Sequence, residues 1–142
     1  MSDKPFSALA FDYGTKSIGV AYGQSVTGTA KELRPLKARD GIPVWDEIHA
    51  LLSQWQPDFL VVGLPLNMDA TESDFSARAR KFANRLHGRF GLEVQLFDER
   101  LTTRAAKEEA YERGHTGAWA NSPIDSIAAR MILEGWFQQR GG

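Results

Sequence analysis

The hydrophobic pattern begins with two short apolar runs, at residues 7–12 and 18–24, separated by a polar turn. Two such runs around a tight turn are typical of an antiparallel β-hairpin. A third strand is expected around residues 29–36, where apolar residues are sparser, and the segment Gly41–Pro43 is expected to break the chain. The N-terminal part of the chain therefore predicts an antiparallel start to a sheet.

The rest of the chain alternates between strand-like and helical patterns. The run Phe59–Leu64 is apolar throughout, as in a strand that is buried on both faces, and Glu93–Phe97 predicts one more strand. Apolar residues recur at helical spacing in the intervening segments. The expected helices cover residues 44–55, 73–86, about 102–114, and 123 onward, the last with Ser122 as its N-cap.

Strands that alternate with helices are expected to be parallel and joined by right-handed crossovers. Together with the hairpin, this predicts an α/β fold with a mixed five-stranded sheet and helices on both faces. The chain has 142 residues, of which 42% are hydrophobic and 25% charged, as expected for a single domain over residues 1–142. The N-terminus is too polar for a signal peptide, and no apolar run reaches the roughly 20 residues that span a bilayer, so we expect no membrane association and a cytoplasmic protein.

Composition narrows the chemistry that the chain can perform. The sequence has no cysteine, which excludes thiolate catalysis and thiolate metal sites, and its three histidines lack zinc-like spacing. The formal net charge of −1 argues against a polycation that coats nucleic acid. It does not exclude a local basic patch, and Arg78, Lys81 and Arg85 follow one another at spacings of three and four along a predicted helix.

Several carboxylates follow predicted strands or open a helix. Asp12 ends the first strand, Asp98 and Glu99 end the last, and Asp125 opens the final helix. In a sheet of this kind, polar groups at the carboxyl ends of the strands line a crevice. Carboxylates that share a crevice repel each other, and Mg²⁺ or Mn²⁺ would relieve the repulsion. Such a site suits two-metal hydrolysis of a phosphodiester, with Asp12 bridging the cations.

Each of these residues also has a purely structural interpretation. Asp12 could hydrogen-bond the amides of the turn that follows it. Glu99 could pair with a neighbouring arginine, and Asp125 could cap its helix together with Ser122. The basic line on the predicted second helix could be a solvated face. The residue pattern alone leaves both interpretations open.

Four segments along nearly the whole chain carry a more specific signal. They are Phe11–Ala21, Val62–Asp69, Asp98–Thr103, and the C-terminal pieces Asp125–Ala129 and Ile132–Glu134. In this order they resemble the YqgF family, also called RuvX, whose members have a ribonuclease H-like fold. A single segment would be weak, because Asp-x-Gly hairpins also occur in sugar kinases and actin-like ATPases.

The resemblance implies that Asp12, Glu99 and Asp125 form an acidic set that holds Mg²⁺ or Mn²⁺. It implies a nuclease that acts on structured nucleic acid. We expect processing of the 5′ end of pre-16S rRNA, and resolution of Holliday junctions in branched DNA is the alternative. The residues expected to contact the substrate are Lys16, Arg78, Lys81, Arg85, Thr102 and Thr103.

The chain departs from the family pattern at two positions. The family usually has arginine where this chain has Ser17, which weakens a phosphate contact, and glycine where it has Ala70. If the latter position needs a positive φ, Ala70 strains its loop.

Two other classes of function remain open from the sequence. A phosphotransferase of the actin type needs two such domains around a cleft, and this chain supplies one. A non-catalytic nucleic-acid-binding or ribosome-assembly module is also compatible with the modest net charge. Both a monomer and a homodimer are open, since symmetric cutting of a junction normally needs a two-fold dimer.

Overall fold

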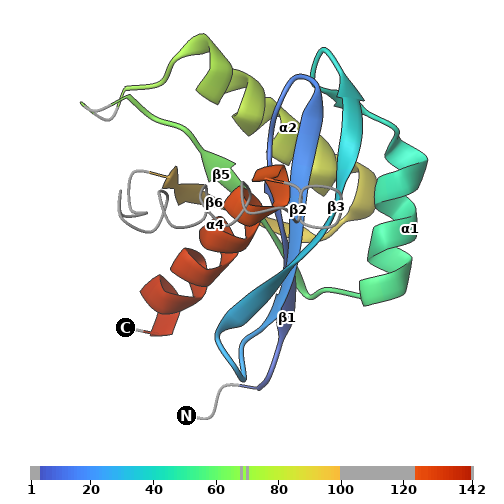
Figure 1. Cartoon of the computed structure of the whole chain (residues 1–142), viewed down its shortest axis with the longest axis vertical. Helices are drawn as coiled ribbons and strands as arrows, with labels where there is room; N and C mark the ends of the chain where they lie inside the picture. Colours follow the sequence, from blue (N-terminus) through green and yellow to red (C-terminus); the bar gives the residue numbers. More distant parts are fainter. Residues whose placement is uncertain (1–3, 68, 70, 100–123, 142) are drawn as a thin grey trace.

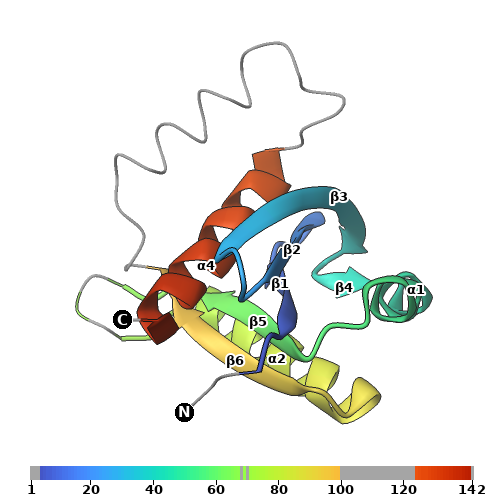
Figure 2. The ribbon, with the colours of Figure 1, turned by 90° about the horizontal axis from the view of Figure 1, so that it is seen from below.

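The computed structural model describes residues 4–67, 69, 71–99 and 124–141. These residues form a six-stranded sheet in the order β4-β3-β2-β1-β5-β6, with helices packed on both of its faces (Figures 1 and 2). The elements are, in chain order, β1 (Ser7–Asp12), β2 (Ser17–Gln24), β3 (Thr29–Arg39), β4 (Ile42–Pro43), α1 (Trp45–Trp55), β5 (Phe59–Leu64), α2 (Asp74–Phe90), β6 (Glu93–Asp98) and α4 (Ile124–Gly141).

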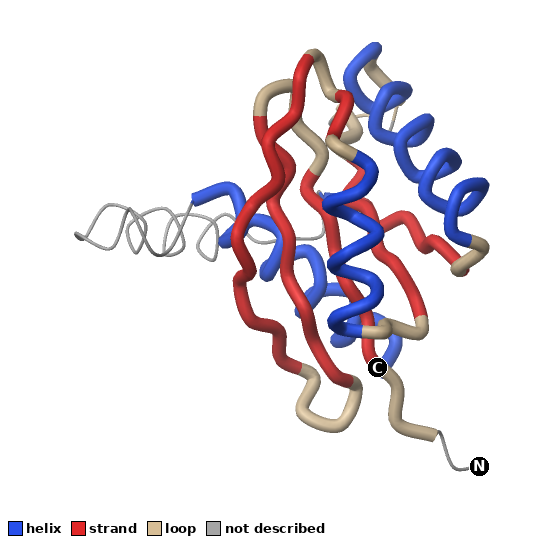
Figure 3. Tube along the Cα trace, turned by 90° about the vertical axis from the view of Figure 1, so that its right-hand side faces the viewer, coloured by secondary structure: helices blue, strands red, loops and turns tan. Residues whose placement is uncertain are grey.

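The pairing of the strands confirms the predicted mixed sheet. β1 pairs with β2 and β2 with β3 in antiparallel fashion, whereas β5 runs parallel to both β1 and β6. Figure 3 shows β2 and β3 as a long twisted ribbon at one side of the sheet. The later strands are reached through helices, as the alternation of patterns predicted.

The sheet has one strand more than the five predicted, because the chain turns at Asp40 and Gly41 rather than breaking. Both residues have positive φ, 51° and 81°, as a two-residue type I′ hairpin turn requires. The turn pairs Arg39 with Ile42 and makes β4. The dipeptide Asp-Gly between extended segments is the signal for this hairpin, although the predicted third strand ends before it, at residue 36.

The two faces of the sheet are buried in two separate cores. On the first face, Leu9 and Phe11 of β1 pack with the apolar sides of α1 and α2. On the second face, Ala8 and Ala10 of the same strand pack under α4. Side chains of a strand alternate between faces, so β1 supplies both cores in turn. We call these the α2 face and the α4 face.

Helix α4 is fixed across β2 and β3 by polar contacts as well as by its apolar side. The buried Ser126 hydroxyl accepts a hydrogen bond from the amide of Val20 and donates one to the carbonyl of Leu33. One turn further on, Arg130 forms ion pairs with Glu32 of β3, at 2.9 Å, and with Glu134, at 2.8 Å. Because Val20 pairs with Phe11, α4 begins close to the carboxyl end of β1.

Helix α2 follows the predicted course and ends later than expected. Ser73 and Ser76 form a capping box at its start, and Gly91, with a φ of 72°, ends it in the left-handed conformation. The helix therefore extends to Phe90 rather than stopping near residue 86. None of the helices in the described ranges combines the length and the apolar composition that crossing a bilayer requires.

Candidate active site

Asp12 lies at the carboxyl end of β1, on the α4 face. Ala8 and Ala10 belong to the core under α4, and the alternation of the strand places the Asp12 side chain on the same side. Its partner in β2 is Gly19, and the parallel register that pairs Phe11 with Val62 brings it next to Gly63 of β5. The strand positions on both sides of this half-buried carboxylate are therefore glycines, which place no side chain of their own beside it.

Glu99 reaches the same place from the end of β6. A Cβ built on Gly63 would stand 2.5 Å from Oε1 of Glu99 and 2.5 Å from Cδ1 of Ile132 in α4. The Glu99 carboxylate thus occupies the space that a side chain at position 63 would fill. Gly63 belongs to the strand between β1 and β6, so Asp12 and Glu99 flank one glycine on one face of the sheet.

The third member of the predicted acidic set is only partly described. The backbone of Asp125 belongs to the first turn of α4, but its side chain, as well as Thr102 and Thr103, lies outside the described residues. In the part of the chain that the structure describes, no three carboxylate or histidine side chains gather as a metal site would require. The structure thus brings two of the three predicted carboxylates to one face.

The donor chemistry of this pair suits a hard divalent cation. Both groups are carboxylates, and a bare glycine backbone lies between them. Mg²⁺ and Mn²⁺ prefer such oxygen donors and are usually bound through one or two carboxylates together with waters. The residues present therefore fit the metal that the sequence predicted.

The basic residues predicted to contact the substrate lie elsewhere. Arg78, Lys81 and Arg85 belong to α2, which covers the opposite face of the sheet. Arg78 donates hydrogen bonds to the carbonyl oxygen of Asp40, at 2.6 Å, and to its carboxylate, at 3.1 Å. This hydrogen bond to Asp40 raises the pKa of the Arg78 guanidinium. Lys16 is exposed in the turn between β1 and β2.

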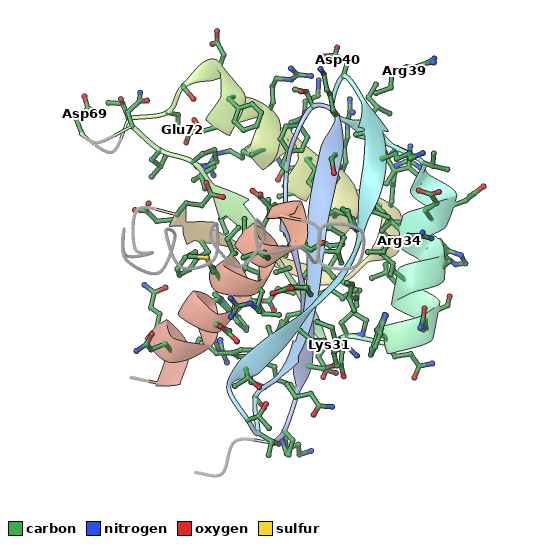
Figure 4. All side chains as sticks on the ribbon, in the orientation of Figure 1. Lys31, Arg34, Arg39, Asp40, Asp69 and Glu72 are labelled. Atoms are coloured by element: carbon green, nitrogen blue, oxygen red, sulfur yellow. The ribbon has the colours of Figure 1, made fainter. Side chains whose placement is uncertain are left out.

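Two cations near the end of β3, Lys37 and Arg39, are not among the contacts predicted from the sequence. Leu36 and Ala38 of β3 pack into the core on the α2 face, so the exposed Lys37 between them points to the α4 face. The exposed Arg39 follows at the end of the strand, where it pairs with Ile42 of β4. Figure 4 shows Arg39 and Asp40 at the tip of the β3–β4 turn, with Lys31 toward the other end of β3. The signal was the alternation of apolar and basic residues over 36–39, which extends past the predicted end of the strand.

The chain is similar to known proteins over most of its length. A family model described as RuvX, Holliday junction resolvase, matches residues 6–139. A protein of Saccharophagus degradans is 63% identical over 131 residues, covering 92% of each chain. One of Aeromonas hydrophila is 58% identical over 136 residues, covering 96% of this chain and 97% of its own. Both carry the name "Putative pre-16S rRNA nuclease".

Solved structures with the same architecture are more distant in sequence. RuvC of Thermus thermophilus, in complex with a Holliday junction substrate, has a TM-score of 0.63 and 20% identity, with 96% of each chain covered. The fowlpox virus resolvase in complex with junction DNA has a TM-score of 0.56 and 13% identity, with 94% of this chain and 98% of that chain covered. At these identities the likeness concerns the fold, which is ribonuclease H-like as predicted.

Proposed function

The chain belongs to the RuvX family, and we propose that it is a cytoplasmic metal-dependent nuclease that processes the 5′ end of pre-16S rRNA. The observation that carries the proposal is the placement of Asp12 and Glu99 on either side of Gly63, on one face of the sheet. The names of the relatives support the rRNA substrate. The description of the family supports a second candidate, resolution of Holliday junctions in branched DNA.

In this proposal Asp12, Glu99 and Asp125 hold one or two Mg²⁺ or Mn²⁺ ions. When bound, such ions lower the pKa of water and offset the charge on the leaving oxygen of a phosphodiester. The chain itself orients the reacting groups. Asp12 is fixed by the pairing of β1 with β2, and Glu99 lies over Gly63, where a side chain would displace it. Gly19 and Gly63, beside Asp12, carry no side chains that would compete with the scissile phosphate for the ions that the carboxylates would hold.

The side-chain positions on the α4 face support a substrate path across β2 and β3. Lys37 stands directly opposite Ser17 in the β2–β3 register, and both point to the α4 face. It therefore places a cation beside the position where the family usually has an arginine. Together with Lys16 and Arg39, it would contact the phosphates that flank the cleaved bond, without reading bases.

We expect Lys37→Ala to weaken the binding of a labelled single-stranded RNA roughly tenfold, because a charged phosphate contact is lost. Adding Ser17→Arg to this variant should restore most of the affinity, since the new guanidinium stands on the same face at the paired position. Fluorescence anisotropy of both variants measures the effect. If the arginine does not rescue binding, Lys37 does not occupy the phosphate position proposed for it.

A cleavage assay tests the proposal and separates its two candidates. Precursor rRNA and a four-way DNA junction are offered side by side with Mg²⁺, with Mn²⁺, and with EDTA. We expect metal-dependent shortening of the rRNA 5′ end and no product in EDTA. Symmetric cutting of the junction without rRNA cleavage would favour the resolvase. Equal binding with EDTA and no product under any condition would replace both candidates with a non-catalytic ribosome-assembly module.

A further inference from the structure

A small basic pocket lies on the α2 face, behind the carboxylates. It has a volume of about 210 Å³ and is enclosed by α2, the start of α1 and the β3–β4 turn. The residues that matter for its chemistry are Tyr13, Gly41, Ile42, Arg78, Lys81 and Arg85. This volume is below the usual range of pockets for small organic molecules, about 300–1,000 Å³, and suits a smaller group.

The charge of the pocket is strongly positive. Three of its lining residues are cationic, and Asp40 is the one acid among them. Arg78 is held by Asp40, whereas the exposed Lys81 and Arg85 form no ion pair among the described residues. Like charges four residues apart on a helix repel each other. A bound anion would relieve this repulsion between Lys81 and Arg85.

The backbone of the β3–β4 turn shapes the pocket from the other side. Gly41 has a φ of 81°, and a Cβ on it would overlap the Tyr13 hydroxyl and stand 3.2 Å from a guanidinium nitrogen of Arg78. The bare backbone therefore lets the hydroxyl and the guanidinium, both hydrogen-bond donors, meet at one wall of the pocket. Phosphate oxygens accept hydrogen bonds from donors of this kind.

The pocket and the candidate active site meet at the end of β1, where their residues are adjacent in the sequence. Tyr13 belongs to the core on the α2 face, whereas Asp12, the preceding residue, points to the α4 face. The two sites therefore lie on opposite faces of the sheet, both at the carboxyl end of β1. A flexible nucleic-acid strand that leaves the carboxylates can reach the pocket by passing around the carboxyl end of β1, past the exposed Lys16 in the β1–β2 turn.

We propose that the pocket between α2 and the β3–β4 turn binds a backbone phosphate of the nucleic acid. The nucleic-acid strand then passes from the α4 face to the α2 face around the carboxyl end of β1. This inference rests on the proposed nuclease function for the identity of the ligand. It gives the cations of α2 a role remote from the carboxylates. It predicts that affinity depends on both faces of the sheet, while the chemistry depends on the α4 face alone.

The test measures binding without cleavage, in EDTA, by anisotropy of a labelled 20-nucleotide RNA and of a duplex DNA of equal length. The double variant Lys81→Ala/Arg85→Ala should bind roughly tenfold more weakly, and the slope of log affinity against log salt should fall by about 0.7 for the single strand, as expected when one phosphate contact is lost. The control Lys31→Ala/Arg80→Ala removes the same charge outside the pocket and should leave both quantities near wild type. Whichever ligand, the RNA or the duplex DNA, loses more affinity in the double variant is the kind of nucleic acid that enters the pocket.

Substitutions of opposite charge at one exposed position on the rim of the pocket provide an independent test, because they should change the affinity for nucleic acid in opposite directions. Ile42 lines the pocket with 53% of its surface exposed, so charges there are tolerated by the fold. Ile42→Glu should weaken binding and Ile42→Lys should strengthen it. The same two changes at Val26, which is 72% exposed on a distant hairpin, should do little. Equal effects at both positions would indicate general electrostatics and overturn the proposal.

Inorganic phosphate serves as the competing probe. If Lys81→Ala/Arg85→Ala abolishes shifts of backbone amide resonances by phosphate but leaves oligonucleotide affinity unchanged, the pocket binds a free anion and the proposal is wrong. The outcome is independent of the nuclease assignment. Weakened binding in a protein that never cleaves would keep the pocket and reject the nuclease, whereas unchanged binding in a protein that cleaves would do the reverse.

Discussion

Asp12→Asn should reduce phosphodiester cleavage by at least about 100-fold, because removing one group that stabilises charge in an active site typically has effects of this size. The asparagine has the same shape as the aspartate and keeps one oxygen, but it loses the negative charge that attracts a divalent cation. Asp12 ends β1, where its backbone pairs with Gly19, and this pairing does not depend on the side chain. The thermal unfolding midpoint and the affinity for RNA in EDTA should therefore stay near the wild-type values.

The matched control is Asp58→Asn, just before β5, at the opposite end of the strands from Asp12. The exposed Asp58 carboxylate accepts a hydrogen bond from the amide of Ser7 at 2.9 Å, which the asparagine oxygen can also accept. Cleavage by this variant should match that of the wild type. If Asp12→Asn cleaves at the wild-type rate under the same conditions, Asp12 holds no catalytic metal and its role is that of a turn-capping residue.

Gly63→Ala is expected to damage both stability and activity. The new methyl group would stand 2.5 Å from the Glu99 carboxylate and from the Ile132 side chain, so both must shift. Overpacking of this kind in a well-packed interior costs about 1–3 kcal/mol in the free energy of unfolding, measured by urea denaturation. The displaced Glu99 should also lower the cleavage rate at temperatures where the variant is fully folded.

Two further variants separate the steric effect from the catalytic one. Gly88→Ala, in α2, places a methyl group where no atom lies within 4 Å, and should be neutral or stabilising by up to about 1 kcal/mol. Adding Ile132→Val to Gly63→Ala removes the aliphatic part of the clash. This double variant should regain stability but not activity, since the Glu99 carboxylate stays displaced. Recovery of both together would show that position 63 affects only packing.

Much of the fold could be predicted because its signals are local. The run Phe59–Leu64 has no polar residue, and this pattern is sufficient to indicate a strand covered on both faces. The turn after Asp12 and the start of α2 at Ser73 are likewise encoded within a few residues, whereas the prediction ended this helix near residue 86, before its cap at Gly91. The end of β3 was missed because Lys37 and Arg39 alternate with only two apolar residues, too short a signal beside a sparse strand.

The candidate site shows the division between local and tertiary information most clearly. The sequence by itself determined that Asp12 ends a strand, that Glu99 follows another, and that α2 carries a line of cations, because these facts depend on order and spacing. Only the tertiary structure decided which groups share a face. The alternation along a strand tells which of its side chains share a face, but which helix covers that face depends on the crossover connections and on packing. For this reason the packing placed Glu99 over Gly63 near Asp12, and left Lys81 and Arg85 on the opposite side.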